Sequence, residues 1–152
     1  MFSIDAVMST DLVTLAPEAS LADARTLMQE HRIHHLPVVD ADRGLCGLLT
    51  LSDLLRASDS SLRNAEERIH ASEISVSDVM VTEVATVSAT ASLRQAALFL
   101  EKHRIGCLPV MQGDKLAGII TDSDFVAVAI NLLEQLEDTE PDDSGFDDAD
   151  VA

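Results

Sequence analysis

Aromatic residues and positive charges are scarce in this chain of 152 residues. It has no tryptophan and no tyrosine, and its 10 Lys and Arg stand against 27 Asp and Glu, for a net charge of −17. Sequence-independent nucleic-acid binding depends on cations at the phosphates and, for single strands, on aromatic stacking platforms. We therefore expect no nucleic-acid partner.

Cysteines and long apolar runs are also scarce. Cys46 and Cys107 are the only cysteines, too few for a disulfide scaffold, and this favours a reducing compartment. No apolar run approaches the roughly 18–20 residues of a membrane span. Residues 1–8 lack the basic and apolar stretches of a signal peptide. We expect a cytoplasmic protein without a membrane partner.

Catalytic and metal-binding patterns are missing as well. No nucleophile stands with a base and an orienting partner, and no glycine-rich phosphate loop is present. His31, His34 and His35 have helical ligand spacing, but Pro37 follows at once, so the spacing does not hold on a helix. We predict that the chain is not an enzyme, holds no metal and requires no cofactor.

Most of the chain is a repeated unit. His-Arg-Ile at 31–33 recurs at 103–105, and Leu-Pro-Val at 36–38 recurs at 108–110. One residue then drops out, and Gly-Leu-Leu-Thr-Leu-Ser-Asp from Gly47 matches Gly-Ile-Ile-Thr-Asp-Ser-Asp from Gly118. Matches in one order with a single gap indicate an internal duplication. The sequence therefore predicts repeat 1 (residues 1–57), a partly helical linker (58–74), repeat 2 (75–136) and a tail (137–152).

The tail is strongly acidic. Residues 137–152 include eight acidic side chains and no basic one. Such a run repels itself and buries almost nothing, so we predict a disordered tail. A docking strip for a basic partner is the alternative.

Each repeat has the pattern β-α-β-β-α. Residues 12–15 and 84–87 are short apolar runs typical of strands, and Ser20 and Ser92 each stand three residues before a side chain that can complete a capping box. The Leu-Pro-Val runs and residues 45–50 and 116–121 predict further strands. Ser52 and Ser123 are expected to cap a final helix. We predict an α+β fold in which two pseudo-symmetric repeats pack sheet to sheet, since neither buries its strands alone.

The doubled order of strand, helix, Leu-Pro-Val, turn and Gly-x-x-Thr-x-x-Asp resembles the cystathionine-β-synthase (CBS) domain. The tandem pair, over about residues 3–132, resembles a Bateman module. The resemblance implies a regulatory module that binds an adenosine-type ligand (AMP, ADP, ATP or S-adenosylmethionine) between the repeats and signals to a protein partner. It also implies a homodimer. The alternative function is a ligand-free dimerising scaffold.

Two kinds of residue are candidates for ribose and phosphate. At each strand-to-helix junction, a carboxylate can accept both hydroxyls of a cis-diol, and the hydroxyls and free N–H groups of the turn form an anion site. The resemblance assigns these roles to Thr50, Ser52, Asp53, Thr121, Ser123 and Asp124. The alternative is helix capping alone.

The adjacent histidines differ between the repeats. The resemblance places His34 and His35 against phosphate, whereas repeat 2 has Gly106 and Cys107 there, so we predict two unequal clefts. A surface histidine pair is the alternative. The predicted adenine pocket, whose members pack in the strands in either case, comprises Val13, Thr14, Leu15, Leu36, Pro37, Ala85, Thr86, Val87, Leu108 and Pro109.

Overall fold

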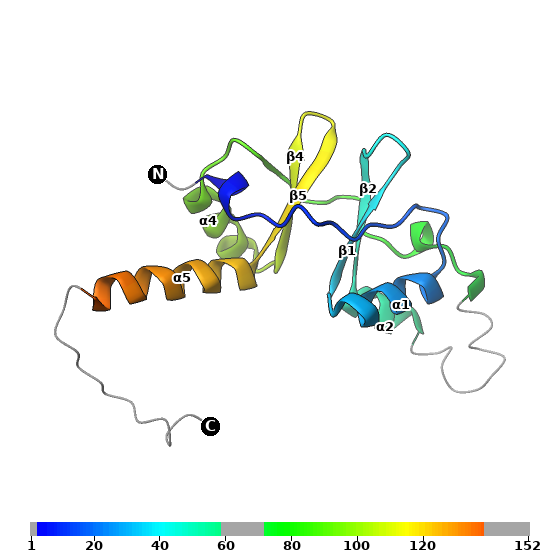
Figure 1. Cartoon of the computed structure of the whole chain (residues 1–152). Helices are drawn as coiled ribbons and strands as arrows, with labels where there is room; N and C mark the ends of the chain where they lie inside the picture. The colour runs from blue at the N-terminus through cyan, green and yellow to red at the C-terminus, as the bar shows by residue number, and fades with distance from the viewer. Residues whose placement is uncertain (1–2, 59–71, 139–152) are drawn as a thin grey trace, which may run out of the picture.

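The protein folds into two lobes that correspond to the two repeats (Figure 1). The structure is a computed structural model that describes residues 3–58 and 72–138. The first lobe has α1 (Leu21–His31), β1 (His35–Val39), β2 (Leu45–Thr50) and α2 (Leu51–Ser58). The second has β3 (Val87–Ser88), α4 (Leu93–His103), β4 (Cys107–Gln112), β5 (Lys115–Thr121) and α5 (Asp122–Glu137).

The predicted α+β class and doubled architecture are confirmed by two small sheets, β1-β2 and β3-β4-β5, with their helices. Most of the predicted linker (58–74) and tail (137–152) falls on 59–71 and 139–152, which lie outside the described residues, so the partly helical linker and the disordered tail stay predictions. Glu137, the first residue of the predicted tail, still belongs to α5. No helix within the described ranges is long and apolar enough to cross a bilayer.

The first helix of each repeat begins where the capping pattern predicts. The Ser20 hydroxyl accepts from the Asp23 amide at 3.1 Å, and the Asp23 carboxylate accepts from the Ser20 amide at 3.2 Å. Ser92 and Gln95 repeat this capping box at the start of α4 with the same two distances. Reciprocal capping satisfies amides that the first turn leaves without helical partners.

The predicted first strands are much shorter than the sequence indicated. Around residues 12–15 only Leu15 pairs, in a single parallel bridge with Val38, and its counterpart is the two-residue strand β3. Leu15 donates to the Pro37 carbonyl and accepts from the Val39 amide. The next bond of that ladder would need an N–H on Pro37, which proline lacks. Pro109 stands at the same point of repeat 2, so the segments before Leu15 and Val87 leave the sheets.

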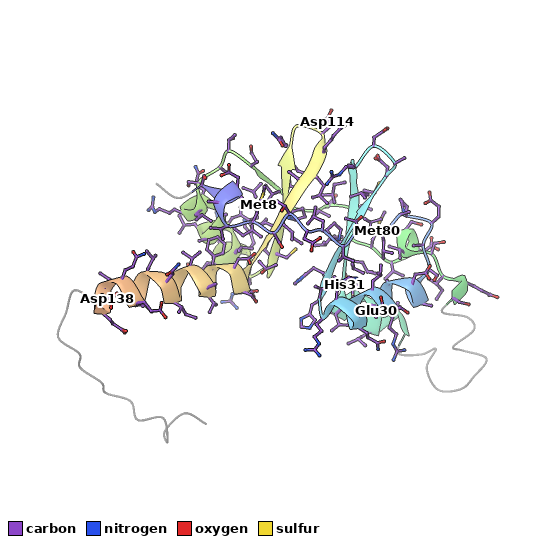
Figure 2. All side chains as sticks on the ribbon, viewed as in Figure 1. Met8, Glu30, His31, Met80, Asp114 and Asp138 are labelled. Carbon is purple, nitrogen blue, oxygen red and sulfur yellow. The ribbon has the colours of Figure 1, made fainter. Side chains whose placement is uncertain are left out.

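The N-terminal segments of the two repeats are exchanged between the lobes. The 3₁₀ turn η1 (Ile4–Ala6) places Ile4 in the core of the second lobe with Leu108, and η2 (Val76–Asp78) places Val76 in the core of the first lobe with Leu36. Figure 2 accordingly shows Met8 beside the second lobe's strands and Met80 beside those of the first. Each core therefore contains residues of both repeats.

Two glycines allow these exchanged segments to cross the sheets closely. Leu48 and Val81 exchange two backbone hydrogen bonds of 2.9 Å, and Ser9 with Ile119 forms the matching pair. A Cβ on Gly47 would lie 2.8 Å from the Val81 carbonyl oxygen. The crossing carries residues 9–13 and 81–85 between the lobes, where they form cleft walls.

Candidate functional site

Two clefts lie between the lobes, and corresponding residues of the two repeats build them. The larger, which we call the apolar cleft, has a volume of about 640 Å³; the smaller, the polar cleft, has about 310 Å³. Both volumes fall in the range of roughly 300–1,000 Å³ that is usual for small-molecule sites. Each cleft combines an exchanged segment and a helix-to-strand turn of one repeat with the strand end of the other repeat.

The polar cleft gathers charged and hydroxyl side chains. Repeat 1 contributes Arg32, His34 and His35 from the turn between α1 and β1, and repeat 2 contributes Thr121 and Ser123 at the start of α5. The carboxylates of Asp11 and Asp122 line it too. The polar cleft therefore has one guanidinium against two carboxylates, with two imidazoles beside them.

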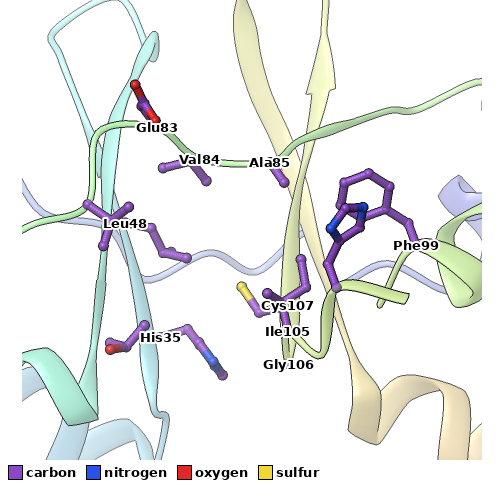
Figure 3. Close-up of a pocket in the computed structure, with 12 residues that line it drawn as sticks. His35, Leu48, Glu83, Val84, Ala85, Phe99, Ile105, Gly106 and Cys107 are labelled. Carbon is purple, nitrogen blue, oxygen red and sulfur yellow. The ribbon is translucent and has the colours of Figure 1, made fainter. Parts of the chain in front are cut away.

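The apolar cleft has mainly hydrocarbon walls. Figure 3 shows Leu48 on one side and Val84, Ala85 and Ile105 on the other. The rings of Phe99 and His103, whose centroids are 4.2 Å apart, close one end. Gly106 and Cys107 stand here where the polar cleft has His34 and His35, so the two clefts differ in their side chains at these equivalent positions. His35 nevertheless lines this cleft as well.

His35 extends from the first lobe toward the second. A Cβ on Gly106 would lie 3.6 Å from its Nε2 atom and 3.5 Å from Oδ2 of Asp122, so these groups converge between the lobes. Burial lowers the pKa of His35, against an opposing effect of the Asp122 carboxylate and with a smaller lowering contribution from His34. Burial therefore favours the neutral imidazole.

Cys107 is the repeat-2 counterpart of His35. It is buried, and burial, with a smaller contribution from the Asp122 carboxylate, raises the pKa of its thiol to about 12. The thiolate is the reactive form of cysteine. Cys107 therefore contributes a small apolar surface to the cleft rather than a nucleophile.

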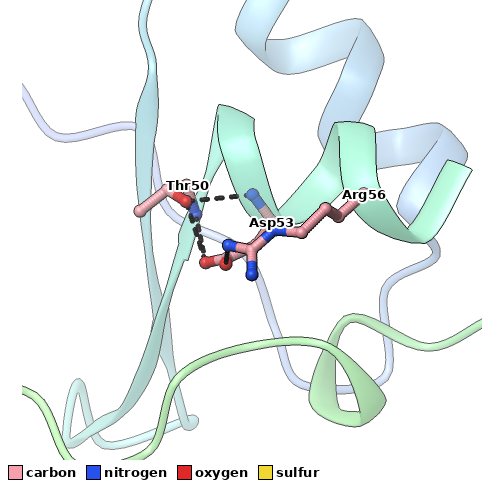
Figure 4. Close-up of polar contacts among 3 residues, drawn as sticks. All are labelled: Thr50, Asp53 and Arg56. Carbon is pink, nitrogen blue, oxygen red and sulfur yellow. Dashed lines mark hydrogen bonds and ion pairs between the residues drawn. The ribbon is translucent and has the colours of Figure 1, made fainter. Parts of the chain in front are cut away.

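The candidate ribose carboxylates also cap helices. The helices begin at Leu51 and Asp122, so the predicted capping role of Ser52 and Ser123 is wrong, and Thr50 and Thr121 occupy the cap positions. Figure 4 shows Oδ2 of Asp53 accepting from the Thr50 hydroxyl at 2.8 Å, while Oδ1 pairs with Arg56 at 2.9 Å.

Asp124 differs from Asp53 in its second oxygen. Its Oδ2 accepts from the Thr121 amide at 2.8 Å and from the Thr121 hydroxyl at 3.3 Å. No basic residue stands three positions later, where repeat 1 has Arg56, because Ala127 occupies that place. Asp124 therefore lacks the ion pair that Asp53 makes with Arg56, although it lines neither cleft.

The predicted site residues divide into those that line the clefts and those that do not. The polar cleft receives His34, His35, Val13, Pro37, Thr121 and Ser123, and the apolar cleft receives Thr50 and Ala85. Asp53 lines a small pocket with Arg56, Ser52 is exposed on α2, and Thr86 lines a pocket between the hairpins. Neither cleft is lined by the predicted ribose residue Asp124, or by Thr14, Leu15, Leu36, Val87, Leu108 or Pro109.

Sequence reasoning did not identify several lining residues. Arg32, the C-cap residue of α1 with a positive φ of 53°, lines the polar cleft. Asp11 and Glu83 occupy equivalent positions on the exchanged segments. The sequence feature that could have predicted these lining positions is Pro37 with its counterpart Pro109. Each proline ends the parallel pairing, so the exchanged segments leave the sheets. No cluster of three potential metal-ligating side chains occurs in the described ranges.

The comparisons with known proteins agree with this architecture. The CBS domain family matches residues 4–60 and 76–131, so the chain belongs to the CBS-domain family and carries a tandem pair. A CBS domain-containing protein of Dictyostelium discoideum is 33% identical over 132 residues, covering 84% of this chain and 91% of the relative. Inosine-5'-monophosphate dehydrogenase of Staphylococcus aureus is 35% identical over 117 residues, which are 75% of this chain and 22% of the enzyme.

Solved structures show the same fold. A Vibrio cholerae protein described as an acetoin utilization protein, AcuB, superposes with a TM-score of 0.79 and 43% identity, covering 93% of this chain and 99% of the other. CBSX2, solved in complex with AMP, superposes with a TM-score of 0.74 and 28% identity, covering 88% and 99%. CBS pairs without a fused enzyme are typically regulatory rather than catalytic, and this chain resembles them along nearly its whole described length.

Proposed function

We propose that the protein is a regulatory module that binds an adenosine nucleotide in the polar cleft and reports its presence to a partner protein. The observation that carries the proposal is the meeting of Arg32, His34 and His35 of repeat 1 with Thr121 and Ser123 of repeat 2 in one cleft. Cations, hydroxyls and the amides at a helix start are the groups that bind phosphate.

The rest of a nucleotide has partners in the same place. Val13 and Pro37 offer an apolar wall for the base. Asp124 does not line the cleft, but it lies directly after the lining residue Ser123 on α5, and we assign its carboxylate to the ribose diol. The AMP complex of CBSX2 supports AMP as the first ligand to test. ADP, ATP and S-adenosylmethionine follow, the last because the carboxylates of Asp11 and Asp122 could face its positive charge.

A matched pair of variants tests the ribose assignment. Asp124→Ala and Asp53→Ala each remove a carboxylate that caps a helix, and each should cost about 1 kcal/mol of stability. Only Asp124→Ala should also abolish the thermal stabilisation by AMP, which is about 2.7 kcal/mol for the wild type at a ligand concentration 100 times the Kd. If both variants bind AMP as the wild type does, the ribose assignment is wrong. If the wild type binds none of the four ligands, the nucleotide function is wrong.

The phosphate assignment needs a different comparison. His34→Gln should weaken ADP and ATP binding more than adenosine binding, because the imidazole contacts only the phosphate side. Isothermal titration of the three ligands measures the difference. Equal losses for all three would show that His34 supports the fold of the cleft rather than the phosphate.

A second function, a dimerising scaffold, is supported by the surface of α5. None of its residues is buried, yet Val126, Ile130 and Leu133 form one apolar row and are 60%, 51% and 55% exposed. No other segment of the described chain covers this row. The helix has four acidic residues and no basic one, whereas a groove between α1 and α2 carries Arg25 and Arg32 at its edge.

We propose a homodimer in which α5 of one copy packs in the α1–α2 groove of the other. This arrangement brings opposite charges together, whereas packing α5 against α5 would bring two acidic helices together. Ile130→Glu should convert the dimer to a monomer in analytical ultracentrifugation. Gln135→Glu adds the same charge on the opposite side of α5 and should leave the dimer intact. A wild-type monomer at all concentrations, or equal effects of both variants, would refute this interface. A protein that dimerises and binds none of the nucleotides would favour the scaffold function.

A further inference from the structure

Among the described residues, His35 is the only one that lines both clefts. The position of His35 in the fold explains why it lines both clefts. The residue opens β1 at the boundary between the lobes, and its imidazole lies against Gly106, where a side chain on the second lobe would otherwise stand. Cys107, the counterpart of His35, is shorter and buried, so it does not reach the polar cleft in return. One imidazole therefore forms part of two sites.

Charged and titratable groups from several elements surround the His35 imidazole. Asp122 at the start of α5 is the acid of the second lobe that acts on the imidazole, and His34 precedes His35 on the chain. The remaining titratable or charged groups on the two cleft walls are Arg32 and Asp11 in the polar cleft, and Glu83, His103 and Cys107 in the apolar cleft.

Ligands in the two clefts favour opposite protonation states of the His35 imidazole. A phosphate in the polar cleft is stabilised by an imidazolium, and it needs one there because Asp11 and Asp122 outnumber Arg32. An uncharged ligand in the apolar cleft displaces water from the other side of the ring. Further desolvation favours the neutral imidazole, as the existing burial of His35 already does.

We infer that His35 couples the two clefts, so that a phosphate-bearing ligand in the polar cleft and an uncharged ligand in the apolar cleft weaken each other's binding. The inference rests on the proposed nucleotide function and adds to it a second ligand class and a means of communication. Because coupling between sites is reciprocal, each ligand reduces the affinity of the other by the same factor. We expect a factor of about 10, within the common range of coupling between sites.

Proton uptake provides the first test. AMP is titrated calorimetrically at pH 7.5 in buffers of different ionisation enthalpy, since a phosphate with a second pKa of about 6 is then already doubly charged. The wild type should take up a proton on binding, up to one per polar cleft. His35→Gln should take up a smaller fraction or none, while the control His34→Gln, which changes the polar cleft but not the apolar cleft, should retain the part due to His35.

Adenosine provides the second test. Rising adenosine should weaken AMP binding until the apparent Kd has increased about 10-fold and then no further, since coupling has a limit and competition for one site has none. In His35→Gln the change should fall below about 2-fold. A Kd that keeps rising, or an unchanged coupling in the variant, overturns the inference while leaving AMP binding in place.

Two other outcomes are also decisive. If neither AMP nor adenosine binds, the coupling is wrong, and the proposed function fails as well when ADP, ATP and S-adenosylmethionine do not bind either. If His35→Gln does not fold, NMR on the wild type replaces it, because the chain has only five histidines and their signals are readily assigned. A His35 pKa that rises on adding AMP supports the inference, and one that does not change overturns it.

Discussion

The exchange of N-terminal segments leads to a prediction about Gly47. An alanine Cβ there would lie 2.8 Å from the Val81 carbonyl oxygen and 2.6 Å from the Met80 sulfur. The thioether can move aside, but the carbonyl accepts the Leu48 amide at 2.9 Å and belongs to the segment that joins the lobes. Gly47→Ala should therefore lower the free energy of unfolding by about 1–3 kcal/mol, the usual cost of overpacking.

Gly118→Ala is the matched variant, since its Cβ would meet the Ser9 carbonyl at the longer distance of 3.0 Å. Neither glycine has a positive φ, so the cost in both is steric rather than conformational. Urea unfolding followed by far-ultraviolet circular dichroism gives the midpoints, and Gly47→Ala should have the lower one. A Gly47→Ala protein as stable as the wild type would refute the close crossing of residues 80–81 over β2.

Three further predictions concern caps and titrating groups. Ser20→Ala and Ser92→Ala should each reduce the free energy of unfolding by about 1 kcal/mol, measured by urea unfolding, and a loss at only one site would show that one capping box is dispensable. Cys107 should resist iodoacetamide at pH 8 until the protein is unfolded, because burial raises the pKa of its thiol to about 12; rapid labelling of the native protein would contradict its burial. Stability should fall as the pH drops below about 6.5, because the pKa of His35 is lowered in the folded state and the unfolded chain then binds more protons. Thermal melts across this range should show a smaller slope for His35→Gln, and an equal slope would exclude that contribution.

The parts of the fold that depend on local interactions could be predicted from the sequence. Ser20 and Ser92 begin helices with their capping partners, and Leu45–Thr50 is a strand at the predicted bounds. These features depend on residues a few positions apart, whose chemistry determines the outcome. The antiparallel pairing of β1 with β2 follows from the short connection between them.

The exchange between lobes could not be predicted in this way. Ile4 and Val76 occupy equivalent positions in two similar repeats, so the apolar pattern fits either core equally well. Only the path of the chain distinguishes the two packings. The cleft walls depend on that path, which is why Asp11, Glu83 and the reach of His35 into both clefts were not anticipated.

The feature that identifies the family also creates the space for a ligand. Pro37 removes the donor that would extend the parallel ladder beyond Leu15, so the preceding segment leaves the sheet and lines a cleft. Pro109 ends the parallel pairing in the same way in repeat 2, so duplication of the unit produces two clefts by one structural mechanism. Divergence at the next positions, His35 against Cys107, then makes the clefts unequal. A duplicated unit thus acquires two clefts of different chemistry without changing its fold.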